Sequence, residues 1–163
     1  MPRSWVQNLC LFIVAVACVL AGLLFARPAP ADPLPVAPPI PAGLQWYNVS
    51  RPLTLKELRG RAVLLDFFSP GCINCIHMLP LEAQLEKRFG PRLVVIGVDS
   101  PKFSSSSSPA AVESFIARHH LTHPMVLDHH SQLWNRYGVN AWPTLVLIGP
   151  RGRVVDGFIG DDY

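Results

Sequence analysis

Cysteine is scarce in this chain, and the few cysteines fall in two different settings. The 163 residues include four cysteines, of which Cys10 and Cys18 lie in a hydrophobic stretch near the start of the chain. In such a stretch a cysteine is expected to act as a small apolar residue. Only Cys72 and Cys75 remain for the rest of the chain, and they are three positions apart. A structural zinc site built from cysteines alone needs four of them and is therefore excluded.

A strong charge of either sign is also lacking. Of the 14 lysines and arginines only Arg3 and Arg27 precede Asp32, so the remainder carries 12 basic and all 11 acidic residues, a net charge of +1. Nucleic-acid-binding domains rely on a clear positive excess to neutralise phosphates. The composition therefore gives no basis for nucleic-acid binding.

Charge is absent altogether from residues 4–26, and from Leu9 to Ala26 the sequence LCLFIVAVACVLAGLLFA is almost continuously hydrophobic. This run exceeds the core of about 7 to 15 residues of a cleavable signal and approaches the about 20 residues of a spanning helix. We expect residues 1–26 to form an uncleaved membrane anchor. The alternative is a signal segment cleaved after Ala31, because the small-residue pattern APA precedes Asp32. In a bacterium either case predicts a periplasmic location, anchored in the inner membrane or released.

Residues 27–43 contain seven prolines in the sequence RPAPADPLPVAPPIPAG. Proline favours an extended polyproline-type chain, here of roughly 50 Å, over a folded element. The sequence predicts a linker over 27–43 and one globular domain over 44–163.

An α/β pattern follows. Residues 54–60 predict a short helix with a capping box between Thr54 and Glu57, and the apolar run 62–68 (AVLLDFF) predicts a strand buried on both faces. A helix is expected over 72–89 and a second strand over 93–99, which together form a right-handed crossover with the cysteines at its first turn. Its inward stripe is expected to comprise Met78, Leu81, Leu85 and Phe89.

The second half continues with shorter elements. Ser108 and Pro109 predict the start of a helix whose inward residues are Val112, Phe115 and Ile116. A short strand is expected over 124–128, and Asp128 can cap a helix that ends at Gly138. Residues 143–160 predict two antiparallel strands around a Gly-Pro-Arg-Gly turn at the sheet edge.

Three chemistries use two closely spaced cysteines, and spacing separates them. Covalent haem attachment requires C-x-x-C-H, whereas Ile76 stands between Cys75 and His77, so haem is disfavoured. A mixed zinc site would need histidines from residues 119–123 or 129–130, more than forty positions away, against roughly 12 to 15 in common zinc fingers. Those histidines, like His77, are more typical of solvated residues near helix ends, although His77 could modulate the thiols.

The redox interpretation uses more of the surroundings. A C-x-x-C pair at a helix start places the first sulfur against free backbone N–H groups and the positive end of the helix dipole, which favours the thiolate. Cys72 is then the attacking nucleophile, and Cys75, one turn further along, resolves the mixed disulfide. An exported protein also works where disulfides persist.

The segments AVLLDFFSPGCINC with Pro80, and YGVNAWPTLVLIGPRGRVV, resemble the thioredoxin superfamily from Leu44 to Gly160. Within it the chain is most similar to TlpA-like redoxins and to the thioredoxin-like domain of NHL-repeat-containing proteins. The resemblance implies a thioredoxin-like fold, with a central mixed sheet and flanking helices. It also implies that Pro80 kinks the active-site helix.

The resemblance further assigns residues to the site. It implies that Asp66 accepts a proton from the resolving cysteine, and a carboxyl on an apolar strand does have its pKa raised by desolvation. A purely structural, hydrogen-bonded Asp66 is the alternative. The resemblance also implies a cis Pro143 opposite the cysteines, which leaves main-chain groups of Trp142 and Thr144 to bind a partner strand. An ordinary trans proline at an edge strand is the alternative.

Two departures from the family pattern stand out. Gly71 occupies the position directly before the first cysteine where many thioredoxins have tryptophan. The sequence stops at Tyr163, so the final helix of a thioredoxin fold is expected to be missing, and the chain could be a truncated form of a longer protein.

These observations predict a thiol–disulfide oxidoreductase that acts on protein thiols and disulfides, works with a redox partner, needs no cofactor or metal and functions as a monomer. Two rivals stay open. SPGC is similar to the TPGC of some peroxiredoxins, which suggests a thiol peroxidase, but Leu65 stands where those enzymes need a proline. The other rival is a truncated, non-catalytic interaction module, since a fold alone confers no activity.

Overall fold

The computed structural model describes residues 33–101 and 108–160, and the folded unit begins at Leu34. The proline content placed the start of the globular part near residue 44, yet the preceding residues already pack on it. Arg153 Nη1 donates to the Leu34 carbonyl at 3.0 Å, and the Tyr137 hydroxyl donates to the Pro38 carbonyl at 2.7 Å. Ala37 is 8% exposed. Prolines lack an N–H but keep their carbonyls, so an extended proline-rich segment can still be held by donors from the domain.

A six-stranded mixed sheet forms the centre, in the order β1-β4-β3-β2-β5-β6. Strands β2, β3 and β4 are parallel, and β1, β5 and β6 each run antiparallel to their neighbours. The strand bounds are β1 Gln45–Tyr47, β2 Ala62–Phe68, β3 Leu93–Asp99, β4 Met125–Leu127, β5 Thr144–Ile148 and β6 Val154–Ile159.

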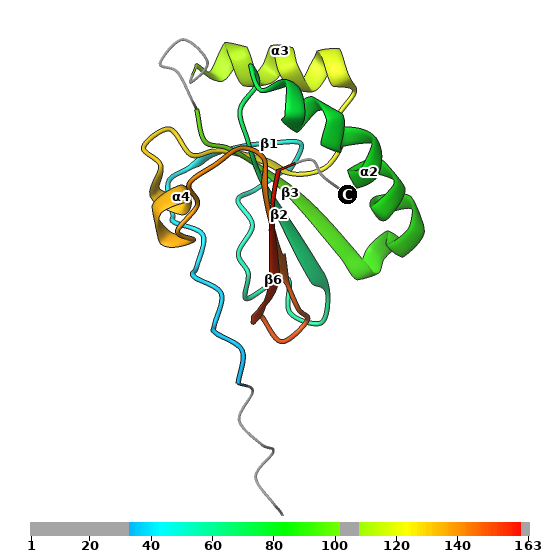
Figure 1. Ribbon diagram of the computed structural model, residues 1–163, viewed down its shortest axis with the longest axis vertical. Helices are drawn as coiled ribbons and strands as arrows, with labels where there is room; N and C mark the ends of the chain where they lie inside the picture. The colour runs from blue at the N-terminus through cyan, green and yellow to red at the C-terminus, as the bar shows by residue number, and fades with distance from the viewer. Residues whose placement is uncertain (1–32, 102–107, 161–163) are drawn as a thin grey trace, which may run out of the picture. The chain divides into compact units, whose positions relative to one another are not determined.

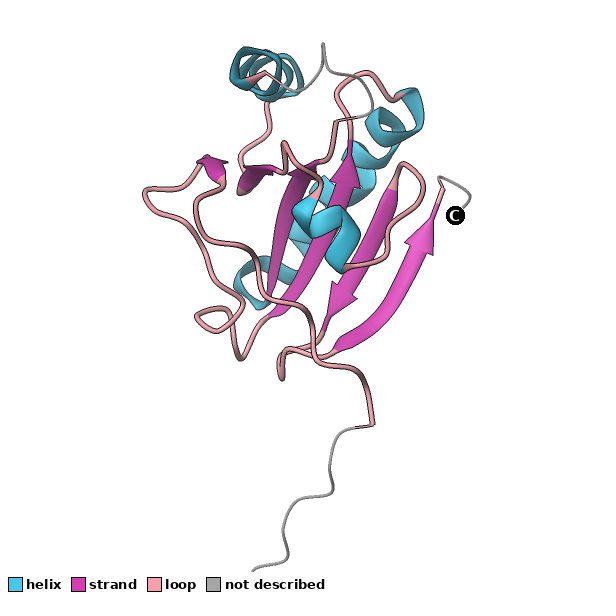
Figure 2. Cartoon of the chain, turned by 90° about the vertical axis from the view of Figure 1, so that its left-hand side faces the viewer, coloured by secondary structure: helices cyan, strands magenta, loops and turns pink. Residues whose placement is uncertain are grey.

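Helices cover both faces of this sheet. The long helix α2 (Ile73–Phe89) leads into the 3-10 turn η1 (Gly90–Arg92), and α3 (Pro109–His119) and α4 (Gln132–Arg136) follow. Figure 1 shows α2 and α4 on opposite sides of the sheet, and Figure 2 shows α4 in front of the strands. This is the central mixed sheet with flanking helices that the resemblance implied.

The alternation of β2 divides the core into two sides. Val63, Leu65 and Phe67 pack with Leu133 in the cluster beneath α4. Leu64 and Phe68 point to the other side and pack with Met78 and Cys75 of α2, respectively. Successive side chains of a strand point to opposite faces, so Asp66, which stands between Leu64 and Phe68 in this alternation, lies on the α2 side. The packing of β2 therefore carries a carboxyl into the interior beneath the cysteine helix.

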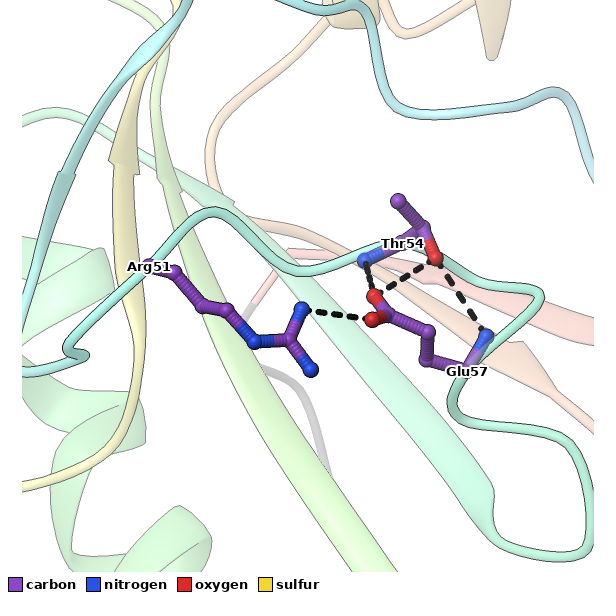
Figure 3. A network of polar contacts seen from close by, with 3 residues as sticks. All are labelled: Arg51, Thr54 and Glu57. Atoms are coloured by element: carbon purple, nitrogen blue, oxygen red, sulfur yellow. Dashed lines mark hydrogen bonds and ion pairs between the residues drawn. The ribbon is translucent and has the colours of Figure 1, made fainter.

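The segment 54–60 differs from its prediction, because it forms consecutive turns and no helix. Its capping box is present: the Thr54 N–H donates to Glu57 Oε2 at 3.1 Å, and the Glu57 N–H donates to Thr54 Oγ1 at 3.3 Å. Arg51 adds an ion pair to Glu57 at 2.5 Å, as Figure 3 shows. Most main-chain bonds here span three residues, and Gly60 leaves the segment with φ of +89°. Too few residues separate the cap from this glycine for a helix to propagate.

As predicted, Asp128 caps α4, although it lies several residues before the helix begins. The helix begins only at Gln132 after Ser131, whose φ is +53°. The Asp128 carboxylate accepts the N–H groups of Leu133 at 3.1 Å and Trp134 at 2.9 Å. A buried side chain at the end of β4 thus anchors the start of α4.

An apolar groove of about 880 Å³ opens beside α2, between it and strands β5 and β6. Phe89, predicted to face inward, is 37% exposed at the edge of this groove. Other groove residues are Leu81, Leu85, Leu145, Leu147, Phe158 and Ile159.

No helix of the described residues has the length and apolar character required to cross a membrane. The predicted anchor over residues 1–26 lies outside the described residues.

Candidate active site

The two cysteines lie at the start of α2 and form a disulfide, with 5.3 Å between their Cα atoms. Cys72 is the N-cap residue of the helix, and its sulfur accepts the N–H of Cys75 at 3.3 Å. Cys72 is half-buried, whereas Cys75 is only 1% exposed. The Cys72 sulfur is therefore the more accessible of the two.

Local backbone bonds hold the outer cysteine at the end of the sheet. The Cys72 N–H donates to the Ser69 carbonyl at 2.9 Å, directly after β2 ends, and the Cys72 carbonyl accepts the N–H of Ile76 at 3.2 Å. The first turn of α2 contains no acidic residue that would oppose a negative sulfur. The free N–H groups and the dipole of the helix then stabilise a thiolate at Cys72 when the pair is reduced.

The Trp142–Pro143 peptide bond is cis, as the resemblance predicted. Trp142 packs against the hydrophobic cluster that contains Cys75, as Cys72 does, and its indole N–H donates to the Ser100 carbonyl at 2.8 Å. Pro143 is buried and its carbonyl accepts the N–H of Gly160 at 2.9 Å. This loop and the cysteine pair therefore share one cluster at the same end of the sheet.

Thr144 is placed differently from its neighbour Trp142. It opens β5, pairs with Phe67 and Ile159, and is 6% exposed. Its hydroxyl donates to the Ala141 carbonyl at 2.8 Å. The half-buried part of the loop is therefore Ala141–Trp142, and Thr144 holds its shape from within the sheet.

Asp66 is buried in the sheet, at 2% exposure. Its strand neighbours in register are Gly97 and Leu145, which offer no charge, and its Oδ1 has no hydrogen-bond partner among the described residues. Burial, and then the nearby Glu82 carboxyl, raise the pKa of Asp66 well above its ordinary range. A carboxyl of this kind holds its proton to a higher pH than an ordinary aspartate does.

Two further buried acids were missed in the sequence. Glu82 of α2 is 1% exposed, and burial raises its pKa to about 7. Asp99, the last residue of β3, is fully buried, and burial followed by the Asp128 charge raises its pKa to about 7. The spacing held a signal for Glu82, since it lies four residues after Met78 and seven after Cys75, on the same face of the helix.

Of the six histidines, only His123 is buried. His123, expected to be solvated, is 6% exposed and its Nδ1 lies 3.4 Å from Glu86 Oε2. Burial lowers the pKa of His123, and the Glu86 charge opposes that shift. His77 and His129 are exposed. Nowhere in the described ranges do three or more metal-ligating side chains gather.

Comparison with known proteins agrees with this geometry. The family model for thioredoxin-like proteins matches residues 60–154. Human NHL repeat-containing protein 2 is 42% identical over 129 residues, which cover 77% of this chain and 18% of that protein. The thiol–disulfide oxidoreductase ResA of Bacillus anthracis is 28% identical over 109 residues, covering 67% of this chain and 61% of ResA. The chain thus spans less than a fifth of the NHL-repeat relative.

A solved structure extends the comparison to the fold. A thiol–disulfide isomerase from Corynebacterium glutamicum superposes with a TM-score of 0.68 at 23% identity, covering 78% of this chain and 88% of the isomerase. The C-x-x-C pair at disulfide distance fits the same family. With a matching family model over more than half of its length, this chain belongs to the thioredoxin-like family.

Proposed function

We propose that the chain is a thiol–disulfide oxidoreductase that exchanges disulfides with protein partners through Cys72 and Cys75. The observation that carries the proposal is the asymmetry of the pair: a half-buried Cys72 caps the helix, and a buried Cys75 lies behind it. Exchange needs an accessible thiolate that attacks and a protected thiol that completes the reaction. Relatives named as thiol–disulfide oxidoreductases support the same reaction class.

In the proposed reaction the Cys72 thiolate attacks one sulfur of a partner disulfide. A bond forms between Cys72 and the partner, and the other partner sulfur leaves as a thiolate. Cys75 then gives its proton to the Asp66 carboxylate and attacks the Cys72 sulfur, which releases the second partner thiol and leaves the Cys72–Cys75 disulfide. The partner is reduced and the pair is oxidised; the reverse sequence oxidises a partner dithiol.

The partner surface in this proposal consists of the residues around the outer sulfur. Ile73, directly after Cys72, is 62% exposed, and Gly71 before it is exposed as well. Many family members carry a tryptophan directly before the first cysteine, where this chain has Gly71. The exposed Ile73 supplies apolar contact area on the other side of Cys72 instead. Trp142 and Pro143 form the opposite side, and Thr144 supports that loop through its bond to Ala141.

The cellular setting is also part of the proposal. The uncharged apolar segment 4–26 supports export, with residues 1–26 acting as a membrane anchor and the domain facing the periplasm. Chemistry by cysteine exchange requires no bound cofactor. We also propose that the domain acts as a monomer.

A trapping experiment tests the exchange function. With Cys75→Ser, the Cys72–partner disulfide cannot be resolved, so mixed disulfides should accumulate and be visible as reducible bands on non-reducing gels. With Cys72→Ser, none should form. Trapping by Cys72→Ser in place of Cys75→Ser would reverse the assignment, and trapping by neither would favour a non-catalytic module.

A further inference from the structure

A line of four titratable side chains leads from beneath the cysteine pair toward the surface. Asp66 on β2 interacts with Glu82 on α2, Glu82 with Glu86 one turn further along the same helix, and Glu86 with His123 before β4. The first two are buried, and the third is 32% exposed at its side chain. The line therefore joins the protein interior to solvent.

The inner end lies close to the resolving cysteine because of how β2 packs on α2. Phe68 shares a cluster with Cys75, and Leu64 shares the adjacent cluster with Met78, three residues further along the helix. Asp66 is the strand position between Phe68 and Leu64 on this face. It is thus placed beneath the helix turn that begins at Cys75.

Glu82 is the unusual member of this line. It is 1% exposed, and among the described residues the Asp66 carboxyl is the polar group that contacts its carboxyl. The strands packed at this level present the apolar side chains of Val95 and Leu145, so Asp66 and Glu86 are the charged groups that face Glu82. An isolated buried carboxyl is costly and is typically retained where it is used.

The outer end is held in place. Asn48 Nδ2 donates to the carbonyls of Leu121 and His123, at 3.1 and 2.9 Å, and fixes the loop that carries His123. His123 Nδ1 then lies 3.4 Å from the Glu86 carboxylate. Glu86 is therefore oriented by one buried neighbour and open to water on its other side.

We propose that Glu82, acting through Asp66, relays protons between Cys75 and solvent, with Glu86 and His123 as the outer end of the relay. This inference rests on the proposed exchange function and adds Glu82 as a residue that acts on the thiol indirectly. It assigns a use to a buried glutamate whose charged neighbours, Asp66 and Glu86, are themselves carboxylates.

The proton balance follows the exchange steps. When Cys75 resolves a mixed disulfide, its proton goes to Asp66, then to Glu82, and leaves through Glu86. When a partner thiolate reduces the Cys72–Cys75 disulfide, Cys75 leaves as a thiolate and takes a proton from Asp66, which recovers it from Glu82. The raised pKa of Glu82, about 7, suits transfer in both directions near neutral pH.

The test separates the two cysteine steps in a single trace. The full chain with Cys10→Ala and Cys18→Ala is reduced and mixed with 5,5′-dithiobis(2-nitrobenzoate). Attack by Cys72 releases the first nitrothiobenzoate, and resolution by Cys75 releases the second. We expect Glu82→Gln to leave the first phase within about twofold and to slow the second about tenfold near pH 7.5, below the 10²- to 10⁴-fold typical of a direct general base.

The pH profile of the second phase is the decisive readout, because a merely structural role would not change it. The relay predicts an inflection near pH 7 in the parent that disappears in Glu82→Gln and returns in Glu82→Asp. Glu113→Gln, on the exposed side of α3, is the matched control and should behave as the parent.

Other outcomes would overturn the relay. A second phase that matches the parent at every pH, or two phases slowed equally, would leave Glu82 a structural residue. If Glu82→Gln does not fold, the partly exposed Glu86→Gln takes its place, and an unchanged second phase there would equally refute the relay. A parent without any second phase would refute the exchange function itself.

Discussion

Replacing Asp99 by asparagine should stabilise the protein, and increasingly so as the pH rises. Asp99 is fully buried, and neither of its carboxyl oxygens has a hydrogen-bond partner in the described part of the chain. In the folded protein the pKa of Asp99 rises from the ordinary aspartate value of 3.8 to about 7, chiefly because of burial and secondarily because of the Asp128 charge. The fold therefore retains a proton that the unfolded chain gives up.

The direction of the pH effect on stability follows from this difference in the pKa of Asp99 between the folded and unfolded protein. Below about pH 4 Asp99 is protonated in both the folded and the unfolded protein, so its titration does not change the free energy of unfolding. Between about pH 4 and pH 7 the unfolded chain ionises while the folded protein does not, so stability falls as pH rises and then levels off above the folded pKa. At about 1.36 kcal/mol per pKa unit, the loss between pH 5 and pH 8 is about 2.5 kcal/mol. Asparagine does not titrate and should avoid this loss.

Urea unfolding of the parent and of Asp99→Asn at pH 5 and pH 8 would measure this difference. The stability advantage of Asp99→Asn should grow by about 2.5 kcal/mol between the two pH values, whereas Asp156→Asn on the exposed strand β6 should show no comparable growth. An advantage that is the same at both pH values would refute the argument that Asp99 is protonated in the fold.

Three further predictions concern the site and its surroundings. Asp66→Asn should slow resolution by Cys75 in stopped-flow exchange and raise the melting temperature at pH 8, because it removes a buried carboxyl whose pKa is raised by burial and by Glu82. If the variant exchanges at the same rate as the parent at all pH values, Asp66 has only a structural role. Ile73→Ser should raise the KM for a protein disulfide without changing the melting temperature, because the side chain is 62% exposed, and an unchanged KM would remove it from the partner surface. Gly97→Ala should destabilise the protein by about 1 to 3 kcal/mol in urea unfolding, because the added Cβ would meet Met125 Sδ and come within 2.9 Å of Met125 Cε. Adding Met125→Val should recover part of the lost stability, and a Gly97→Ala variant as stable as the parent would show that Met125 moves freely.

The sequence predicted most of what positions the cysteines. The continuous apolar run of β2, the helix that begins after Cys72 and the second parallel strand have strong local signals, and all three are confirmed. The cis Trp142–Pro143 bond came from the resemblance, since no local pattern distinguishes it from an ordinary proline at a strand edge.

The features that sequence reasoning missed depend on contacts between distant segments. The prediction for His123 was wrong because its burial arises from Glu86 and from the loop held by Asn48, which lie far away in sequence. Glu82 was overlooked because a glutamate on a helix is usually solvated, and only the packing of α2 on β2 shows which face it occupies. The predicted helix over 54–60 was wrong because a capping box also stabilises a single turn.

The open groove beside α2 affects how the folding of this chain can be measured. Phe89, Phe158 and Ile159 expose 37%, 52% and 65% of their surfaces at its edge in the folded state. Fluorescent dyes that report molten globules bind exposed apolar surface of this kind. The native protein should therefore enhance the fluorescence of such a dye, and a bright signal would be no sign of loosened packing. Near-ultraviolet circular dichroism of the tryptophans near α4, Trp134 and Trp142, whose rings lie 4.2 Å apart, would report tertiary order without that ambiguity.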